Sequence, residues 1–403
     1  MKTRLYILFT LLVASSQIFA QTAAHYKDMI YPTLSMSTVQ YSDTFQQSMD
    51  IYQPVGDSSC FRPVLILAHG GSFTSGTRAD DNAVVTLCNN FGMRGFVTVS
   101  IDYRLGAALS MLDSSYAINE VLQAVGDAKA AVRWLRKSAY NGNPYRIDTN
   151  FIFCGGNSAG GVLFMHYIYI DSVNEAPATL RQIINNNGGL EGNSGNPGYS
   201  SEVRAVLSLA GGLNIPEFAG PGSKPIAHFQ GDQDAVVPYG CADAENGLIP
   251  VRLCGLGACN PIYLANGITH VSVVFPGDGH VPWSSDLAKM TKVDTICANF
   301  LDTTNVFPAI TYCALANGIN NVTDGSDVKM FPNPATQQVN ISITDASAYT
   351  KIQLIDAVGR LVEEKPVTTY MNTIERNNLA GGVYFVKLLR KDGQSFVKKV
   401  VFE

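Results

Sequence analysis

A serine flanked by glycines is the first group in this sequence that could carry out chemistry. Gly156-Asn157-Ser158-Ala159-Gly160 has the spacing G-x-S-x-G, and it lies between the apolar runs 151–154 and 162–165. A sharp turn from a strand into a helix lifts such a serine clear of a sheet and places its hydroxyl at the positive end of the helix. The spacing also occurs by chance in ordinary loops, but in this setting it predicts a nucleophile.

A serine that attacks a carbonyl also needs N–H donors for the oxygen anion that develops. The segment His69–Phe73 reads His-Gly-Gly-Ser-Phe and directly follows an apolar run. We expect the backbone N–H groups of Gly70, Gly71 and Ala159 to donate to this oxygen. An isolated His-Gly-Gly could be a simple tight turn, and only its pairing with Ser158 makes it informative.

The serine needs a base, and the sequence contains six histidines. In a fold that presents its nucleophile on such a turn, the base follows both the nucleophile and the acid in chain order. His280 meets this condition, because it lies in the loop after the apolar run Val271–Phe275, at the strand end where ligands bind in open sheets. The remaining histidines come too early, lie inside a helix or strand, or begin a strand at its wrong end: His25, His69, His166, His228 and His270.

The acid that orients the base follows the apolar run Ile226–Phe229, where Asp232 and Asp234 are both possible. Asp234 is preferred, because it lies deeper in the loop, ahead of two valines that would return the chain to the core. Its role would be to hold the imidazole tautomer and to stabilise the imidazolium. A calcium loop would need further oxygen ligands, which are not evident. We therefore expect no metal and no cofactor, and we interpret Asp278 as a loop-solvating residue.

These side chains need a sheet whose strand ends meet at one edge, and the pattern of the chain predicts one. Between about residues 49 and 300, short apolar runs alternate with helical patterns, as in a parallel sheet covered on both faces. The clearest helical pattern spans residues 119–138. The fold class is therefore α/β, with a doubly wound, mostly parallel sheet. The expected strands are Val64–Ala68, Phe96–Ile101, Phe151–Cys154, Ala205–Leu209, Ile226–Phe229 and Val271–Phe275.

Two stretches interrupt this alternation. Residues 171–201 are rich in Asn and Gly, and we expect an excursion over one end of the sheet that shapes the substrate site. After residue 326 the runs 338–343, 351–355, 383–389 and 395–402 alternate or are β-branched, with no helical run between them, which predicts a small all-β sandwich. The expected organisation is a signal peptide (1–20), a catalytic domain (21–305), a linker (306–326) and the sandwich (327–403).

Composition narrows the class of protein. Hydrophobic residues make up 46% of the 403 residues, which excludes global disorder. With 28 Lys and Arg against 33 Asp and Glu, the chain has no basic excess, so we do not expect a nucleic-acid partner. The basic start, the apolar run Leu5–Val13 and the small residues before Ala20 are typical of a secretory signal. A membrane anchor is the alternative, but the run is short of the ~20 residues that a spanning helix needs, so we expect no transmembrane segment in the mature chain.

The eight cysteines take their meaning from export. In an exported chain some of them should form disulfides, although the sequence does not give the connectivity. Cys154 lies inside an apolar run and is expected to be a buried thiol. No two cysteines have the spacing CxxC, so a structural zinc site is not expected.

With these residues placed, the region from about 49 to 300 resembles the α/β-hydrolase superfamily of serine esterases, in particular carboxylesterases and hormone-sensitive-lipase-like enzymes. The resemblance implies a triad of Ser158, Asp234 and His280, with oxyanion donors at Gly70, Gly71 and Ala159. Ser72 stands where the lipase-like branch has a third glycine, which leaves open which amides donate. The acid loop 231–234 fits a general G-x-x-D pattern and leaves the subfamily open. The motifs occur in the order His69–Phe73, Val99–Gly106, Asp127–Leu135, Arg146-Ile147 and Gly156–Gly161.

Residues 327–403 resemble another family, the C-terminal sorting domain of type IX secretion substrates. Such domains direct a protein across the outer membrane and are often removed at the cell surface. The resemblance implies a secreted or cell-surface protein with the type IX machinery as its partner. A carbohydrate-binding or stalk-like sandwich is the alternative, but few aromatics and no tryptophan argue against a sugar-stacking platform. The motifs are Met330–Ala335, Ile355–Arg360, Leu379–Lys387 and Lys398–Val401.

Together these features favour a secreted serine carboxylic-ester hydrolase that works through an acyl-enzyme. A location outside the cell suggests esters of extracellular polymers, such as acetylated or feruloylated polysaccharide, with short acyl esters and polyesters behind them. The same residues could serve an amidase or peptidase. Outside the enzymes, the alternative is a catalytically silent surface adhesin, against which the presence of Ser158, Asp234 and His280 together argues.

Overall fold

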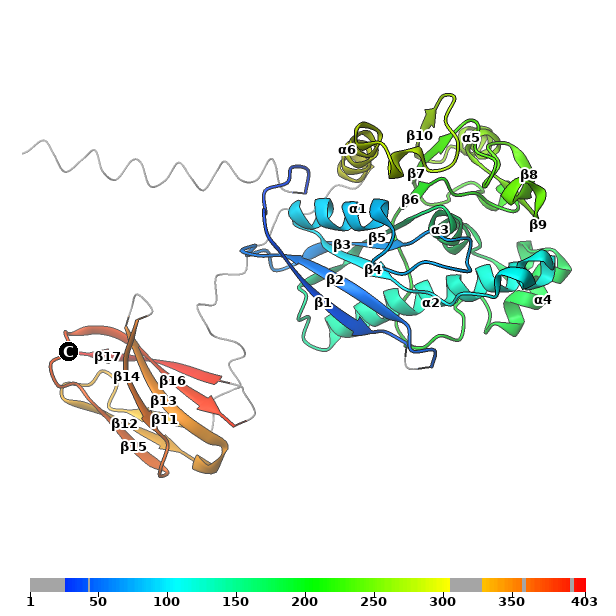
Figure 1. Ribbon diagram of the computed structural model, residues 1–403. Coiled ribbons are helices and arrows are strands. Elements are labelled where there is room, and N and C mark those ends of the chain that lie inside the picture. The colour runs from blue at the N-terminus through cyan, green and yellow to red at the C-terminus, as the bar shows by residue number, and fades with distance from the viewer. Residues whose placement is uncertain (1–25, 43, 305–327, 357–359, 392–394) are drawn as a thin grey trace, which may run out of the picture. The chain divides into compact units, whose positions relative to one another are not determined.

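The computed structural model describes residues 26–42, 44–304, 328–356, 360–391 and 395–403. These residues fall into two compact units, one before and one after residues 305–327 (Figure 1). The expected signal peptide (1–20), the expected linker (306–326) and His25 lie outside the described residues.

The first unit is built on an eight-stranded sheet with the order β1-β2-β4-β3-β5-β6-β7-β10. The strands β1 and β2 pair antiparallel, as do β2 and β4, and every other neighbouring pair is parallel. The fold class expected from the sequence is confirmed. The strands are β1 (Leu34–Gln40), β2 (Ser48–Pro54), β3 (Arg62–Ala68), β4 (Val97–Ile101), β5 (Ile147–Asn157), β6 (Val206–Leu209), β7 (Ile226–Gly231) and β10 (His270–Phe275).

Burial explains which strands the sequence predicts. The strands β3, β4, β6 and β7 are buried at every position, because helices cover both faces of the sheet. Their sequences therefore contain apolar runs, from which these strands can be predicted. The edge strand β1 is exposed at most positions and carries several polar residues, so it has no such run. Its neighbour β2 mixes buried apolar residues with Asp50 and Gln53. Both strands were missing from the sequence-based prediction.

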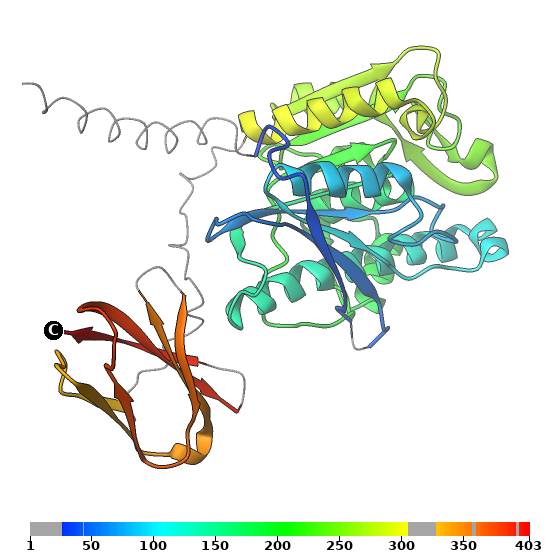
Figure 2. The same ribbon diagram turned by 60° about the vertical axis from the view of Figure 1, so that its left-hand side comes forward.

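Helices pack on the two faces of the sheet, as Figures 1 and 2 show. On one face α2, α3 and α4 share a hydrophobic core with the sheet, and on the other face α1 and α6 share a second core. Helix α1 begins at the N-cap Asp81, whose side chain accepts from the N–H groups of Ala83 and Val84. The helices are α1 (Asn82–Met93), α2 (Ser114–Tyr140), α3 (Ala159–Tyr169), α4 (Ala178–Asn186), α5 (Leu256–Ala265) and α6 (Leu287–Thr304).

The Asn/Gly-rich stretch 171–201 contains the helix α4, which the sequence-based prediction did not include. Leu180 and Ile184 are the buried residues of this helix and belong to the core that includes α2. Beyond α4 the chain is fastened to α2, since Arg133 donates to the carbonyl of Gly195 at 2.8 Å and pairs with Glu191 at 2.8 Å. The excursion is therefore part of the helical layer on this face of the sheet.

A short hairpin of β8 (Cys241–Ala244) and β9 (Ile249–Cys254) projects from the loop after β7. Cys241 and Cys254 face each other across it and form a disulfide. Cys60 is also disulfide-bonded. Cys154 is a buried free thiol, as expected. Cys88, Cys259 and Cys297 are also buried free thiols.

The second unit is an all-β sandwich, as expected. One sheet has the order β11-β12-β15 and the other β14-β13-β16-β17, with antiparallel pairing in both. Apolar residues of the two sheets share one core, which includes Val339, Leu354 and Val386. The strands are β11 (Val328–Phe331), β12 (Gln338–Ile343), β13 (Tyr349–Asp356), β14 (Leu361–Pro366), β15 (Met371–Glu375), β16 (Gly382–Arg390) and β17 (Ser395–Phe402).

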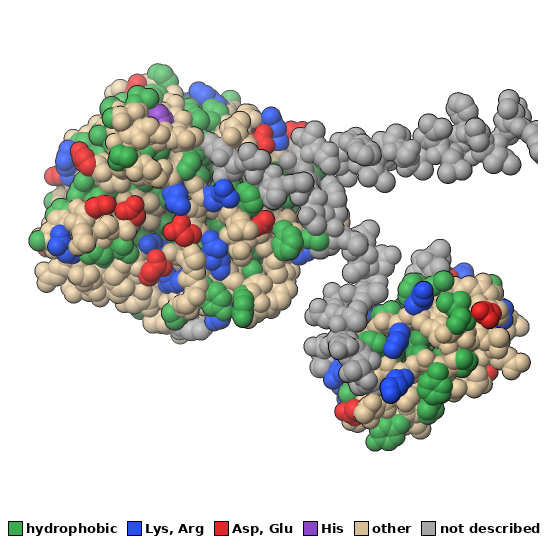
Figure 3. Space-filling view, turned by 180° about the vertical axis from the view of Figure 1, so that it is seen from behind, with side chains coloured by type: hydrophobic (Ala, Val, Ile, Leu, Met, Phe, Trp, Pro, Cys, Tyr) green, Lys and Arg blue, Asp and Glu red, His purple; other side chains and the backbone are tan. Residues whose placement is uncertain are grey.

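Acidic and basic side chains intermingle over the face of the first unit that Figure 3 shows. Among the described residues, no helix combines the length and the apolar character needed to cross a bilayer.

Candidate active site

Ser158 lies on a strained turn between β5 and α3. Its backbone angles are φ 53° and ψ −116°, a conformation that costs a non-glycine residue free energy of order 1–3 kcal/mol. The glycines on either side make the turn possible, since a Cβ on Gly156 would collide with the backbone of Gly160, and one on Gly160 with that of Ala68. The turn therefore presents the Ser158 hydroxyl at the N-terminus of α3, as the sequence predicts.

His280 reaches Ser158 from the loop after β10. Its Nε2 lies 2.7 Å from the Ser158 Oγ, and its Nδ1 lies 2.8 Å from the Asp234 Oδ2. The imidazole side chain is 18% exposed and the Asp234 side chain is fully buried. The structure thus brings together the three residues for which the sequence predicts a triad, in the order serine, histidine, aspartate.

The surroundings of the two candidate acids separate their roles. Asp234 Oδ1 accepts from the backbone N–H groups of Val236 and Val237, both at 3.0 Å, while Oδ2 faces His280 and also accepts from the Gln230 side chain at 3.3 Å. Asp232 Oδ1 instead accepts from the backbone N–H of Gly277 at 2.7 Å and ties the loops after β7 and β10 together. Asp234 is therefore the carboxylate placed to orient the imidazole.

The other described histidines do not approach the Ser158 hydroxyl in this way. His228 is buried inside β7, and burial lowers its pKa to about 4. His270 begins β10 and contacts the carbonyl of Ile268 at 2.7 Å. His69 stacks on the ring of Tyr103 with a centroid distance of 4.4 Å. His166 lies on α3, two turns beyond Ser158, with its Nδ1 2.8 Å from the carbonyl of Val162.

The loop after β3 carries the candidate oxyanion amides. The backbone N–H of Gly70 donates to the Asp81 Oδ2 at 2.9 Å, so this amide is occupied and does not fit the role given to it by the sequence. Gly71 and Ser72 both have positive φ, 115° and 51°, which turns the chain sharply here. Among the described residues, no acceptor takes the amides of Gly71, Ser72 or Ala159. The three free amides beside Ser158 therefore include Ser72 in place of Gly70.

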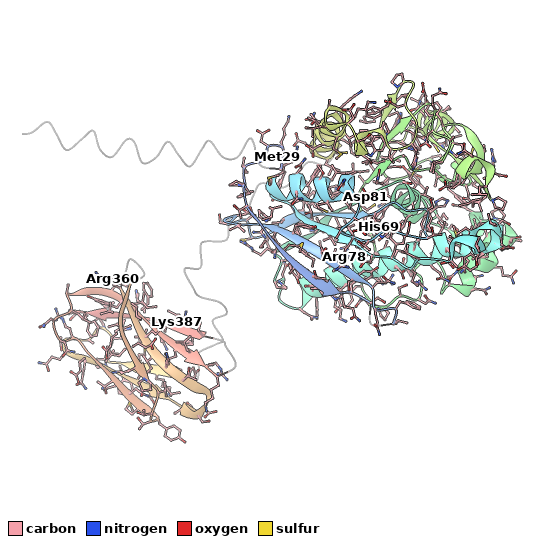
Figure 4. All side chains as sticks on the ribbon, in the orientation of Figure 1. Met29, His69, Arg78, Asp81, Arg360 and Lys387 are labelled. Atoms are coloured by element: carbon pink, nitrogen blue, oxygen red, sulfur yellow. A yellow bond between two sulfur atoms is a disulfide. The ribbon has the colours of Figure 1, made fainter. Side chains whose placement is uncertain are left out.

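Asp81, which the sequence-based prediction did not include, holds this loop in place. Its Oδ2 accepts both from the Gly70 amide and from the Asn157 side chain, at 2.9 and 3.0 Å. Asn157 in turn accepts from the indole N–H of Trp283 at 3.0 Å. One carboxylate thus joins the N-terminus of α1, the oxyanion loop and the residue before Ser158. Figure 4 labels Asp81 together with His69, which lies in the same loop as Gly70.

Two hollows meet at Ser158. The first, which we call the apolar pocket, has an empty volume of about 710 Å³, part of it open to solvent, and its lining is mostly apolar. The second, which we call the polar hollow, is more open and contains His280. Ser72, Ser158, Val236 and Glu245 line both hollows, and the Ser72 hydroxyl donates to the Glu245 carboxylate. The apolar pocket is otherwise lined by Phe73, Met111, Ala117, Ile118, Val121, Leu122, Ala159, Val162, His166, Leu180, Asn214, Val237, Ala244, Ile249, Val251 and Leu253. The polar hollow is otherwise lined by His69, Gly70, Gly71, Gly76, Asp80, Asp81, Asn82, Asn157, His280, Val281 and Ser284.

This arrangement has the parts that acyl transfer requires. A hydroxyl hydrogen-bonded to an imidazole can become a nucleophile, and three free amides can hold an oxygen anion. Among the described residues, no group of three or more His, Cys, Asp or Glu is placed to hold a metal ion.

Two regions of the chain match known families. Residues 49–219 match the BD-FAE family, and residues 329–403 match the family described as a secretion system C-terminal sorting domain. The first range contains Ser158 and the oxyanion loop, and the second covers the sandwich.

Curated relatives match shorter stretches. The chain is 30% identical over 125 residues to Esterase LipC of Mycobacterium tuberculosis, which covers 31% of this chain and 27% of that protein. It is 23% identical over 175 residues to Carboxylesterase patB of Penicillium expansum, which covers 37% of this chain and 30% of that protein. The chain thus spans less than a third of the length of these curated relatives.

Among solved structures, the apo form of Thermogutta terrifontis esterase 2 matches 69% of this chain and 97% of its own, with 20% sequence identity and a TM-score of 0.49.

Proposed function

We propose that this chain, which carries an α/β-hydrolase domain of the BD-FAE esterase family and a type IX secretion sorting domain, is an exported serine carboxylic-ester hydrolase. The observation that carries the proposal is the continuous hydrogen-bonded series from Ser158 through His280 to Asp234, beside three unoccupied amides.

In the first half of the reaction Ser158 Oγ attacks the ester carbonyl carbon. His280 Nε2, 2.7 Å away, takes the hydroxyl proton, because its Nδ1 proton is held by Asp234 and its Nε2 lone pair is therefore free. The amides of Gly71, Ser72 and Ala159 stabilise the oxygen anion of the tetrahedral intermediate. His280 then gives the proton to the leaving alcohol oxygen, and an acyl-enzyme remains.

In the second half a water molecule takes the place of the alcohol. His280 Nε2 accepts a proton from this water as it attacks the acyl carbon, and the same amides hold the anion. When the intermediate collapses, the proton returns to Ser158 Oγ and the carboxylic acid leaves. Apart from the water of the second half, neither half of this reaction uses a metal ion or a cofactor.

Export supports a substrate outside the cell. The signal peptide at residues 1–20 and the sorting domain at residues 327–403 would carry the enzyme across both membranes by the type IX machinery. Esters of extracellular polymers are then the natural substrates, such as acetylated or feruloylated polysaccharide, with short acyl esters and polyesters as further members of the class.

The test is hydrolysis of p-nitrophenyl esters with acyl chains of two to twelve carbons, by the full chain and by Ser158→Ala, beside the matching p-nitroanilides. We expect ester turnover that the variant loses. Turnover of the anilides in preference to the esters would replace the esterase by an amidase, and equal rates for both proteins would leave a catalytically silent chain.

A further inference from the structure

The side chain of Ser72 connects the oxyanion loop to the hairpin. Its hydroxyl donates to the carboxylate of Glu245, which lies in the turn between β8 and β9. Both residues line the apolar pocket and the polar hollow, as Ser158 does. The two partners are 173 residues apart in the sequence, so this contact joins distant parts of the chain directly beside the nucleophile.

The backbone of Ser72 is strained and has few other anchors. Its φ of 51° lies in the left-handed region, which a non-glycine residue keeps only where its surroundings hold it there. The next residue, Phe73, is held by burial and by its carbonyl, which accepts from the Gly106 N–H at 2.8 Å. Among the described residues, none bonds to the backbone N–H or the carbonyl of Ser72. The hydroxyl bond to Glu245 is therefore the polar contact that fixes Ser72.

Glu245 is itself held by the loop that carries the triad acid. Its backbone N–H donates to the carbonyl of Val236 at 2.8 Å, and the N–H of Asn246 donates to the carbonyl of Ala235 at the same distance. The N–H of Val236 in turn donates to the Asp234 carboxylate at 3.0 Å. The acid loop thus fixes the turn that carries Glu245, and Glu245 gives the Ser72 hydroxyl a partner whose backbone is anchored.

We infer that Glu245 is a positioning residue of the oxyanion hole, the set of free amides beside Ser158. Through the Ser72 hydroxyl it keeps the Ser72 backbone N–H directed at the place where the ester oxygen becomes an anion; this role rests on the proposed function. Amides that are oriented before the charge develops stabilise it without any reorganisation. Without Glu245, the backbone of Ser72 can relax out of the left-handed region and turn the amide away.

The acceptor oxygen of Glu245 carries this role, and its negative charge does not. A negative charge near the developing anion raises the free energy of the transition state rather than lowering it. A glutamine offers the same acceptor oxygen without the charge, and a leucine occupies similar space without an acceptor. These two substitutions therefore separate positioning from charge and from packing.

The experiment is a double-mutant cycle on kcat for p-nitrophenyl acetate with the full chain. Glu245→Leu and Ser72→Ala should each lower kcat by about tenfold, less than the roughly 10²- to 10³-fold that follows the loss of a whole donor. The combined variant should also lose about tenfold, because either change alone already removes the shared hydrogen bond. KM should change by less than about threefold, since the same amides serve both halves of the reaction and their loss slows both.

Glu245→Gln tests the conservative change. It should keep kcat within about threefold of the unaltered chain, and in the Ser72→Ala background Glu245→Gln and Glu245→Leu should behave alike. The matched control is Asp243→Leu, because Asp243 is an exposed carboxylate of the same hairpin that lines neither hollow. This control should leave kcat unchanged. Thermal unfolding curves establish that each variant folds, and Ser72→Ala removes the same hydrogen bond from the other side if Glu245→Leu does not fold.

Three results would overturn the inference while leaving the esterase intact. They are single effects that multiply to about 100-fold in the combined variant, a Glu245→Gln variant as slow as Glu245→Leu, and an unchanged kcat in either single variant. If the full chain hydrolyses no ester at all, the proposed function fails and this inference fails with it.

Discussion

The Asp234→Asn variant keeps the shape of the side chain and exchanges one acceptor oxygen for an NH₂ group. Two backbone N–H groups, those of Val236 and Val237, hold the Oδ1 position at 3.0 Å, so the remaining oxygen of the asparagine must stay there. Its NH₂ group then faces the His280 Nδ1, which accepts the hydrogen bond and gives up its proton. The proton moves to Nε2, and the base that Ser158 needs is lost.

The expected loss is large for a change of one atom. Without a lone pair at Nε2, kcat should fall by about 10³- to 10⁴-fold, as it does when a triad histidine is held in the wrong tautomer, or roughly 4–5.5 kcal/mol of transition-state stabilisation. The assay is kcat for p-nitrophenyl acetate with the full chain, beside a thermal unfolding curve that shows that the variant folds.

The matched control is Asp232→Asn in the same loop. This carboxylate serves the Gly277 amide and makes no contact with His280, so its variant should stay within about tenfold of the unaltered kcat. If Asp232→Asn abolished activity and a folded Asp234→Asn kept it, the assignment of the acid and the reasoning about the loop amides would both be refuted.

Three further perturbations follow from the described contacts. Asp81→Ala removes the N-cap of α1 and the acceptor that holds the Gly70 amide. It should lower the free energy of unfolding by about 2 kcal/mol and kcat by at least about tenfold. An unchanged kcat would show that the oxyanion loop keeps its shape without Asp81. Replacing Cys241 and Cys254 together by alanine opens a loop of 13 residues worth about 3 kcal/mol, and should raise KM for p-nitrophenyl nonanoate more than for the acetate, because the hairpin walls the apolar pocket. Burial lowers the pKa of His228 to about 4, against 6.5 in the unfolded chain, so between these values the unfolded chain binds a proton that the folded chain does not. His228 should therefore lower the free energy of unfolding by about 2 kcal/mol at pH 5. In urea unfolding curves, His228→Gln should lose less stability between pH 7 and pH 5 than the unaltered chain.

The parts of the fold that the sequence predicts are those whose burial leaves a mark on the residues. All six expected strands exist, because parallel strands covered on both faces are rich in apolar residues. The edge strand β1 faces solvent and alternates weakly, so its residues resemble a loop. Helix α4 was missed for a similar reason. Only Leu180 and Ile184 are buried in it, so two apolar residues among Asn and Gly do not produce a recognisable helical period.

The candidate site divides in a similar way. Ser158, His280 and Asp234 follow from chain order and from the rule that ligands bind at the carboxyl ends of parallel strands. The amide of Gly70 could not be assigned correctly, because its partner Asp81 lies eleven residues further on and meets it only through the fold. Asp81 could have been found from its place directly before α1, because a carboxylate there is typical of an N-cap and can also accept a hydrogen bond from a neighbouring loop.

The walls of the apolar pocket lie beyond any local pattern, because they come from elements far apart in the chain. Met111 precedes α2, Leu180 belongs to α4 and Val251 to the hairpin. The range that matches the BD-FAE family, 49–219, ends before the hairpin and before Asp234 and His280. Asp234 and His280 are constrained by the chemistry of the triad, whereas the strands of the hairpin have to satisfy only a packing requirement against α2. Substitutions in the hairpin can therefore change which acyl group fits while Ser158, His280 and Asp234 stay in place, so we expect acyl preference to follow the hairpin more closely than the residues around the serine.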